Sequence, residues 1–255
     1  MSWHKITGLI LWTSCMCIIG LHFFTQGFLL KRLIVPKNST CRADFHYNSR
    51  SPSSDPNGSY GCWLDRSYKR AVILVIDALR FDFLKPVSSD DTRPFINKFT
   101  HVNYLIKTKP KNCRLMKFVA DPPTTTMQRL KGLTTGGLPT FIDAGENFAG
   151  SAITEDNFIA QMVTQRKKIT FMGDDTWLSL YPNVFHRSFP FPSFNVKDLH
   201  TVDNGIIKHI LPEFLRSDWD VLIAHFLGVD HCGHRFGPNH PAMTDKLIQM
   251  DSVIR

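Results

Sequence analysis

The sequence has 255 residues, of which 43% are hydrophobic and 20% charged, and its formal net charge is +8. This length accommodates one substantial α/β domain with an appendage, and the composition is ordinary for a globular fold. The basic residues are spread along the chain and form no basic stripe interleaved with aromatics. A generally basic surface is therefore favoured, and nucleic acid is not expected as a partner.

The N-terminal segment is almost free of charge from Ile6 to Leu30. At about 1.5 Å per residue, a helix of this length crosses a hydrocarbon core of about 30 Å. The segment exceeds the apolar region of a cleaved signal peptide, and no small-residue cleavage pattern follows at once. We predict an uncleaved signal anchor over residues 1–35, with a transmembrane helix whose core runs from Gly8 to Phe24.

Local charge does not decide on which side of the membrane the rest of the chain lies. Lys31, Arg32 and Lys37 follow the span, and the positive-inside rule alone would keep the downstream part cytosolic. Glycosylation sequons begin at Asn38 and Asn57, and they favour the lumen. The two signals oppose each other.

Residues 36–67 are rich in Ser, Asn, Pro and Gly, and this composition predicts a loop-rich stalk. Within these residues, Cys41 and Cys62 flank a segment rich in Ser, Asn, Pro and Gly, where a disulfide would connect the two ends of an otherwise loose segment. Cys15 and Cys17 lie in the span as apolar filler, and the sequence contains no CxxC pair for a thiolate zinc site.

From residue 68 to 255 the pattern is that of an α/β domain with a mainly parallel sheet flanked by helices. Short apolar runs rich in β-branched residues predict strands buried on both faces. These runs cover 71–76, 169–173 and 221–228, and they end near Asp77, Asp174, Asp175 and Asp230. Because ligands bind outside the carboxyl ends of parallel strands, one cleft would collect these acids.

Helical patterns alternate with the strands. They cover 127–135, closed by Gly136 and Gly137; a segment from a Thr154 cap to about Lys167; 202–215, despite Pro212; and 240–255.

Two motifs allow a structural and a functional interpretation. Asp77 at a strand end is either a helix N-cap or a metal ligand that a rigid strand holds in place. Thr124, Thr125 and Thr126 either begin a helix or place a hydroxyl where helix N–H groups bind a phosphate. A metal beside such a hydroxyl would lower its pKa and make it a nucleophile.

The densest group of candidate ligands runs from Gly228 to Pro238. Asp230 and His234, four residues apart, are predicted to converge on one zinc, with Gly233 and Gly237 allowing sharp turns. The alternative is a polar loop. His225, inside the preceding strand, is predicted to be a hydrogen-bonded core histidine.

Together these motifs resemble the alkaline phosphatase superfamily, in its nucleotide-pyrophosphatase-like branch. Within that branch, longer segments resemble the GPI ethanolamine phosphate transferases, from the anchor to Arg255. Those segments are Ile76 to Phe83, Asp121 to Lys131, Phe171 to Trp177 and Ala224 to His234.

The resemblance implies an endoplasmic reticulum membrane enzyme of GPI-anchor biosynthesis with a luminal catalytic part. It would transfer phosphoethanolamine from phosphatidylethanolamine to the third mannose of the GPI precursor. The family site holds two zinc ions, and the implied protein partner is the small multi-spanning stabilising subunit PIG-F.

By the family motif, Asp77 would bind one metal, and Asp230 with His234 the other. Thr126 would be the nucleophile, through a phosphoethanolaminyl-threonine intermediate, with Thr124 and Thr125 remaining possible. Thr125, Arg129 and His231 are predicted to contact the substrate.

The sequence departs from the family pattern near its end. The family completes its metal sites with a later Asp-His-Gly motif and a further His, which do not occur before Arg255. We therefore expect an inactive, truncated catalytic domain with at most one well-bound metal. The alternatives are a non-catalytic luminal short isoform and a phosphodiesterase of the same superfamily.

Overall fold

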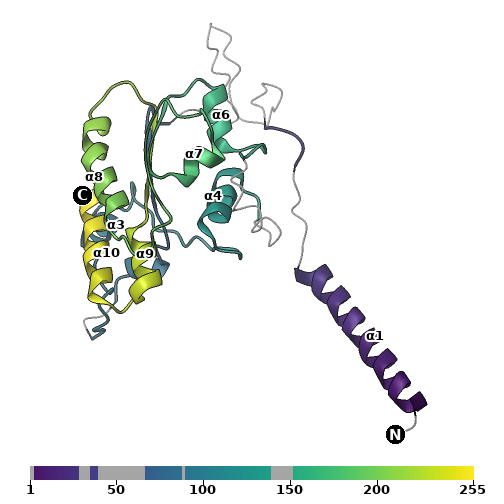
Figure 1. Cartoon of the computed structure of the whole chain (residues 1–255). Helices are drawn as coiled ribbons and strands as arrows, with labels where there is room; N and C mark the ends of the chain where they lie inside the picture. The colour runs from purple at the N-terminus through teal and green to yellow at the C-terminus, as the bar shows by residue number, and fades with distance from the viewer. Residues whose placement is uncertain (1–2, 29–34, 40–66, 88–89, 139–151) are drawn as a thin grey trace, which may run out of the picture. The chain divides into compact units, whose positions relative to one another are not determined.

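The computed structural model describes residues 3–28, 35–39, 67–87, 90–138 and 152–255 (Figure 1). The chain forms two compact units, one of Met1–Pro36 with Val119–Asn157 and one of Lys37–Phe118 with Phe158–Arg255. The first unit contains the helices α1 (Trp3–Phe28) and α4 (Thr126–Thr135), and the second contains the sheet.

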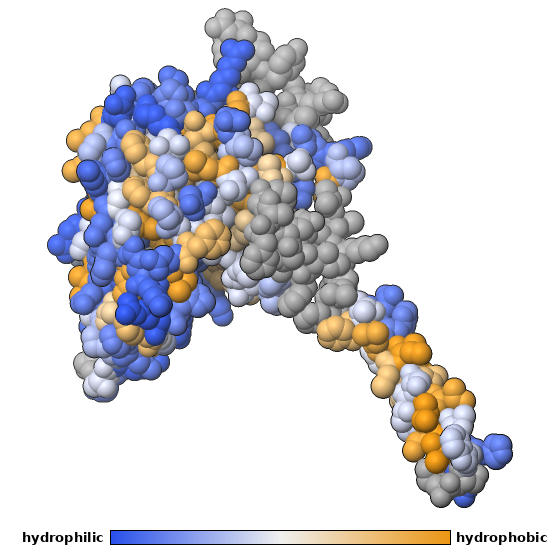
Figure 2. Space-filling view, in the orientation of Figure 1, coloured by the Kyte–Doolittle hydropathy of each residue, from blue (hydrophilic) through white to orange (hydrophobic). Residues whose placement is uncertain are grey.

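Helix α1 has 26 residues and is long and apolar enough, by length and composition, to cross a membrane. Its large apolar side chains, such as Leu11, Trp12 and Phe23, are exposed around the helix (Figure 2). An apolar N-terminal helix was expected here, and the structure confirms it.

The second unit is built on a four-stranded, all-parallel sheet of order β1-β4-β2-β3. The strands are β1 (Ala71–Ile76), β2 (Ile169–Asp174), β3 (Arg187–Phe191) and β4 (Val221–Phe226). The sequence correctly predicted the parallel sheet and three of these strands. β3 was not predicted, because its run Arg-Ser-Phe-Pro-Phe alternates and contains a proline.

Burial of the strands follows the order of the sheet. Every residue of β2 and β4 is buried, as predicted for strands covered on both faces. The same prediction was wrong for β1, where Val72 is 41% exposed. Among the described strands, β1 lies at an edge of the sheet and pairs only with β4, so fewer neighbours cover its side chains.

Helices lie on both faces of the sheet (Figure 1). On one face, α8 (Thr201–Phe214) packs against β2, β3 and β4, while α10 (Pro241–Ile254) packs against α9 (Gly228–Phe236) and α3 (Thr100–Thr108). α6 (Phe158–Thr164) and α7 (Thr176–Leu180) lie on the other face, and α2 (Phe81–Leu84) is a short turn after β1. A buried hydrophobic core cluster includes Phe83, Phe99, Met172, Ile206, Leu222, Phe226 and Leu247.

Helices α4, α8 and α10 match the predicted ranges within about two residues. The C-cap Gly136 of α4 has φ +70°, as expected for a helix-ending glycine. The Thr154 cap was wrong, because α6 begins only at Phe158. Gly233 was also misassigned to a turn, because it lies inside α9.

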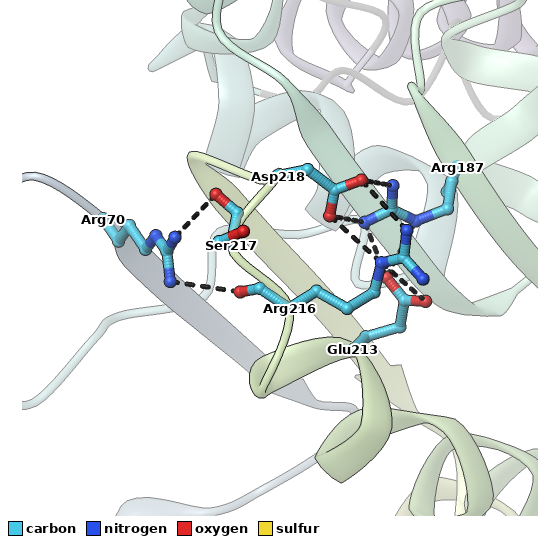
Figure 3. A network of polar contacts seen from close by, with 6 residues as sticks. All are labelled: Arg70, Arg187, Glu213, Arg216, Ser217 and Asp218. Atoms are coloured by element: carbon cyan, nitrogen blue, oxygen red, sulfur yellow. Dashed lines mark hydrogen bonds and ion pairs between the residues drawn. The ribbon is translucent and has the colours of Figure 1, made fainter.

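A cluster of charged residues ties the amino ends of the strands together (Figure 3). Arg187, at the start of β3, bonds Asp218 through both terminal nitrogens and donates through Nε to Glu213 at 2.8 Å. Arg70, just before β1, donates to the carbonyls of Arg216 and Ser217. The edge opposite the candidate site is thereby fixed by bidentate contacts.

We predict that a small substitution at Gly173 in β2 strongly lowers the stability of the fold. Its φ is +127°, and a Cβ there would lie 2.2 Å from the carbonyl oxygen of His225 on β4. We expect Gly173→Ala to lower the free energy of unfolding by about 3 kcal/mol or more, because backbone strain and overlap add. Urea unfolding of the chain in detergent micelles, followed by circular dichroism, measures this.

Gly233→Ala is the matched control, because a Cβ there meets nothing within 4 Å outside its own helix backbone. We expect it to be neutral or to stabilise α9 by up to about 1 kcal/mol through helix propensity. Equal unfolding curves for Gly173→Ala and the unmodified chain would contradict the proposed close approach of β2 to β4.

Candidate active site

The pairing of β1 with β4 brings two predicted ligand segments to one edge of the sheet. Ile76 is in register with Phe226, and the Asp77 amide donates to the Phe226 carbonyl at 3.0 Å. Asp77 therefore leaves β1 at the level where β4 ends and α9 begins. The carboxyl ends of parallel strands are where ligands bind in open α/β sheets.

Asp77 is not the N-cap of the following helix. Its Oδ1 accepts from the amide of Ala78 at 2.9 Å, and Ala78 has φ +55°. α2 begins only at Phe81, with Arg80 in the N-cap position. The capping interpretation is thus wrong, and the Asp77 side chain, 17% exposed, lies at the sheet edge.

Asp230 and His234 come together on α9, with Asp230 Oδ1 3.5 Å from His234 Nε2. The predicted convergence of these residues is present, but a continuous helix produces it, because positions i and i+4 share one face. The polar-loop alternative was wrong for the same reason. Gly237, with φ +76°, ends the helix, so one of the two predicted glycine turns exists.

The two carboxylates are close enough to influence each other. Burial, and next the negative charge of Asp77, raise the pKa of Asp230, while His234 and His231 oppose this shift. A divalent cation would relieve the repulsion, and carboxylate and imidazole are ligands that zinc accepts. Within the described ranges, no three His, Cys, Asp or Glu side chains form a group that could hold a metal ion. Asp230 and His234 are of the residue types that zinc accepts, and as a pair they supply part of a ligand set.

His225 is the site residue whose surroundings were not predicted. It is 1% exposed, as expected for a core histidine, and Trp177 Nε1 donates to its Nδ1 at 3.0 Å. Its Nε2 lies 3.7 Å from Asp77 Oδ2, and its Nδ1 lies 3.5 Å from Asp174 Oδ2. Because Nδ1 accepts from Trp177, the neutral ring carries its proton on Nε2, toward Asp77. The sequence hints at these contacts of His225 only by placing a histidine near the end of an apolar strand.

The other acids at this edge have structural bonds. Asp174, 1% exposed, accepts from the amide of Thr176 at 2.8 Å. Asp175 accepts from the hydroxyl of Ser193 at 2.7 Å.

His231, on α9, is 3% exposed and its Nδ1 lies 2.7 Å from the carbonyl oxygen of Asp198. This contact ties α9 to the loop before α8. A role of His231 in substrate binding stays a prediction.

The predicted nucleophile segment belongs to the smaller unit. α4 begins at Thr126, and the N-cap Thr125, with φ −69° and ψ 150°, makes no side-chain bond to the helix end. Thr124 and Thr125 are exposed and Thr126 is partly buried. Arg129 Nε is buried and has no hydrogen-bond partner in the part of the chain that the structure describes. The approach of these residues to Asp77 stays a prediction.

The predicted stalk features are only partly visible. Asn38 is described and exposed. Asn57, Cys41 and Cys62 lie outside the described residues, and the glycosylation and disulfide predictions for them stay open.

The fold is the predicted parallel sheet flanked by helices. It is similar to the crystal structure of the C-terminal periplasmic domain of EcEptC from Escherichia coli in complex with Zn, with a TM-score of 0.51 and 11% identity over 73% of this chain and 57% of that one. Residues 151–255 match the family described as type I phosphodiesterase / nucleotide pyrophosphatase.

Sequence comparison identifies more similar relatives than the structural comparison does. The chain is 50% identical, over 96% of its length, to GPI ethanolamine phosphate transferase 3, catalytic subunit, of Homo sapiens. It is 44% identical over 96% of its length to GPI ethanolamine phosphate transferase 3 of Saccharomyces cerevisiae. It covers 23% of the length of each of these relatives. The resemblance predicted from the motifs is confirmed.

The raised pKa of Asp230 predicts how the stability of the metal-free chain depends on pH. Its folded-state pKa lies above the unfolded value of about 3.9, so ionised Asp230 destabilises the fold at neutral pH. The cost fades as pH falls through the folded-state pKa toward the unfolded one. We expect Asp230→Asn to raise the melting temperature of the metal-free chain at pH 7, with the gain shrinking toward pH 4 or so.

Thermal unfolding in EDTA across this pH range measures the effect. Asp245→Asn is the control, because Asp245 is an exposed carboxylate on α10 and its loss should change stability little. A lower melting temperature of Asp230→Asn at pH 7 would show that the carboxylate stabilises the metal-free fold.

Proposed function

We propose that this chain supplies catalytic-domain residues of a GPI-anchor phosphoethanolamine transferase. The reaction moves phosphoethanolamine from phosphatidylethanolamine to the third mannose of the GPI precursor, in the lumen of the endoplasmic reticulum. The observation that carries this proposal is that Asp77 and the Asp230–His234 pair follow two paired strands at the carboxyl edge of the sheet. It occurs in a chain similar over 96% of its length to proteins named GPI ethanolamine phosphate transferase 3.

The metal ions would be held by these side chains. In this proposal Asp77 ligates one zinc, and Asp230 with His234 ligates the other. Bound zinc would neutralise charge on the phosphoryl oxygens and lower the pKa of the attacking hydroxyl. The raised pKa of Asp230, caused by burial and by Asp77, supports a site that gains from a cation.

Thr126 is the proposed nucleophile. Its Oγ1 would form a bond to phosphorus while the bond from phosphorus to the diacylglycerol oxygen breaks. A mannose hydroxyl would then attack the phosphorus and release Thr126. The position of Thr126 at the start of α4 supports this role, because helix N-terminal N–H groups and the helix dipole favour an anionic phosphate.

Arg129 and the membrane contacts complete the proposal. Arg129 has a buried Nε without a partner among the described side chains, and a guanidinium is suited to a phosphate oxygen. α1 would anchor the chain beside its lipid substrates, and PIG-F would be its stabilising partner. Thr125 and His231 remain candidate substrate contacts.

A phosphodiesterase is the second candidate, because residues 151–255 match a family described by that activity. Hydrolysis would use the same ligands and nucleophile, with water in place of the mannose hydroxyl. The product distinguishes the two reactions: a transferase modifies the glycolipid, while a phosphodiesterase releases free phosphoethanolamine.

A chimera tests the function, since the chain spans about a quarter of its relatives. Residues 1–255 would replace the aligned segment of the human relative in human cells that lack that relative. We expect restored GPI-anchored proteins at the cell surface, measured by flow cytometry. Asp77→Asn and Asp230→Asn should abolish the rescue, whereas Asp245→Asn should retain it. A chimera expressed at the normal level that releases phosphoethanolamine without rescue would favour the phosphodiesterase.

The three threonines can be separated in the same chimera. Thr126→Ala should abolish the covalent phosphoethanolamine adduct on the 121–131 peptide, measured by mass spectrometry of the purified protein with its donor lipid. Thr124→Ala and Thr125→Ala should retain the adduct, as should the control Thr135→Ala at the other end of α4. An adduct that persists in Thr126→Ala would move the assignment to a neighbouring threonine.

A further inference from the structure

A buried ion pair lies beneath the start of α9 and has no part in the proposed reaction. Lys246 Nζ on α10 is 3.1 Å from Asp203 Oδ2 on α8, and the two residues are 2% and 1% exposed. Lys246 also donates to Gln249 at 2.9 Å. Burial of two charges is costly, so a pair of this kind requires strong compensating bonds.

The compensating bonds of Asp203 lead to α9. Its Oδ1 accepts from the amides of Leu227 and Gly228, both at 3.0 Å. These are the N-cap and the first residue of α9. Amides at a helix start lack partners within the helix, and a negative charge there is favoured by the helix dipole. One carboxylate thus joins α8, α9 and α10.

Gly228 fits this arrangement closely. A Cβ on Gly228 would lie 2.1 Å from Asp203 Oδ2 and 2.8 Å from Lys246 Cδ. The backbone of α9 therefore rests directly on the ion pair. A shift of the carboxylate must move the first turn of the helix.

That first turn carries Asp230, and His234 lies one turn further. We propose that Asp203, held by Lys246, is a positioning residue that sets the place of both α9 side chains for a divalent metal ion. This inference rests on the proposed function, because it assumes that Asp230 and His234 bind metal. Ligand atoms must be held within about 0.5 Å of their productive positions, so the position of α9 affects the affinity for the metal ion.

The chain contains a matched control. Asp251 on α10 is 5% exposed and binds the start of α3 in the same way. Its Oδ2 accepts from the Thr100 hydroxyl and the His101 amide, and its Oδ1 accepts from the Val102 amide. α3 carries none of the proposed ligands. Changes at Asp203 and Asp251 should therefore cost similar stability but differ in metal binding.

The experiment compares Asp203→Glu with Asp251→Glu in the full chain in detergent micelles. Each variant keeps its charge and lengthens the side chain by one methylene beneath a helix start. Cobalt(II) is the probe, with affinity from its visible absorption and stability from thermal unfolding. We expect Asp203→Glu to weaken cobalt binding by about tenfold or more and to alter the spectrum. Asp251→Glu should leave the cobalt affinity and the cobalt spectrum unchanged.

Each outcome decides the inference. Equal cobalt affinity and spectra for Asp203→Glu and the unmodified chain would overturn it while leaving the metal site intact. Cobalt binding that survives Asp230→Asn, or no binding by the unmodified chain, would overturn the proposed metal site and the inference with it. If Asp203→Glu does not fold, Asp203→Asn keeps the side-chain size and an oxygen acceptor, and the same comparison is made with Asp251→Asn.

Discussion

The register of β1 against β4 is the constraint on which the site depends. It sets Ile76 beside Phe226, so Asp77 leaves one strand where α9 leaves the other. Three further features serve this junction: the glycine at 173 lets β2 approach His225, Trp177 orients that histidine, and Asp203 seats α9. The parallel pairing of β1 with β4 therefore brings two motifs that are distant in sequence to the same edge of the sheet.

Local patterns predicted three of the four strands and the longer helices because each depends on its own apolar period. The exposure of β1 was not predictable in this way, because it depends on the order of strands that are distant in sequence. α9 was missed since glycine, histidine and aspartate are poor helix formers, and the caps that support the helix come from Asp203 and Gly237. The proximity of Asp230 and His234 was predictable from their spacing, while the contacts of His225 arise from three separate segments.

The electrostatics of the site oppose stability in the absence of a cation. Asp230 is partly buried beside a second carboxylate, and the resulting shift of its pKa is a cost to the metal-free fold at neutral pH. Asp203 is also buried, but Lys246 and two amides compensate its charge. The contrast separates two kinds of carboxylate in one small region: one whose charge is satisfied within the protein, and one whose charge is available to a ligand.

The distance along the chain between the paired strands has a consequence during biosynthesis. β1 pairs with β4, and about 150 residues separate them. At about 5–20 residues per second, a ribosome needs roughly 10–30 s to produce β4 after β1 has been made. For that time the apolar segment Ala-Val-Ile-Leu-Val-Ile has no partner strand from its own sheet. The nascent chain therefore exposes this apolar segment during this interval, and the junction of Asp77 with α9 forms only after β4 has been made.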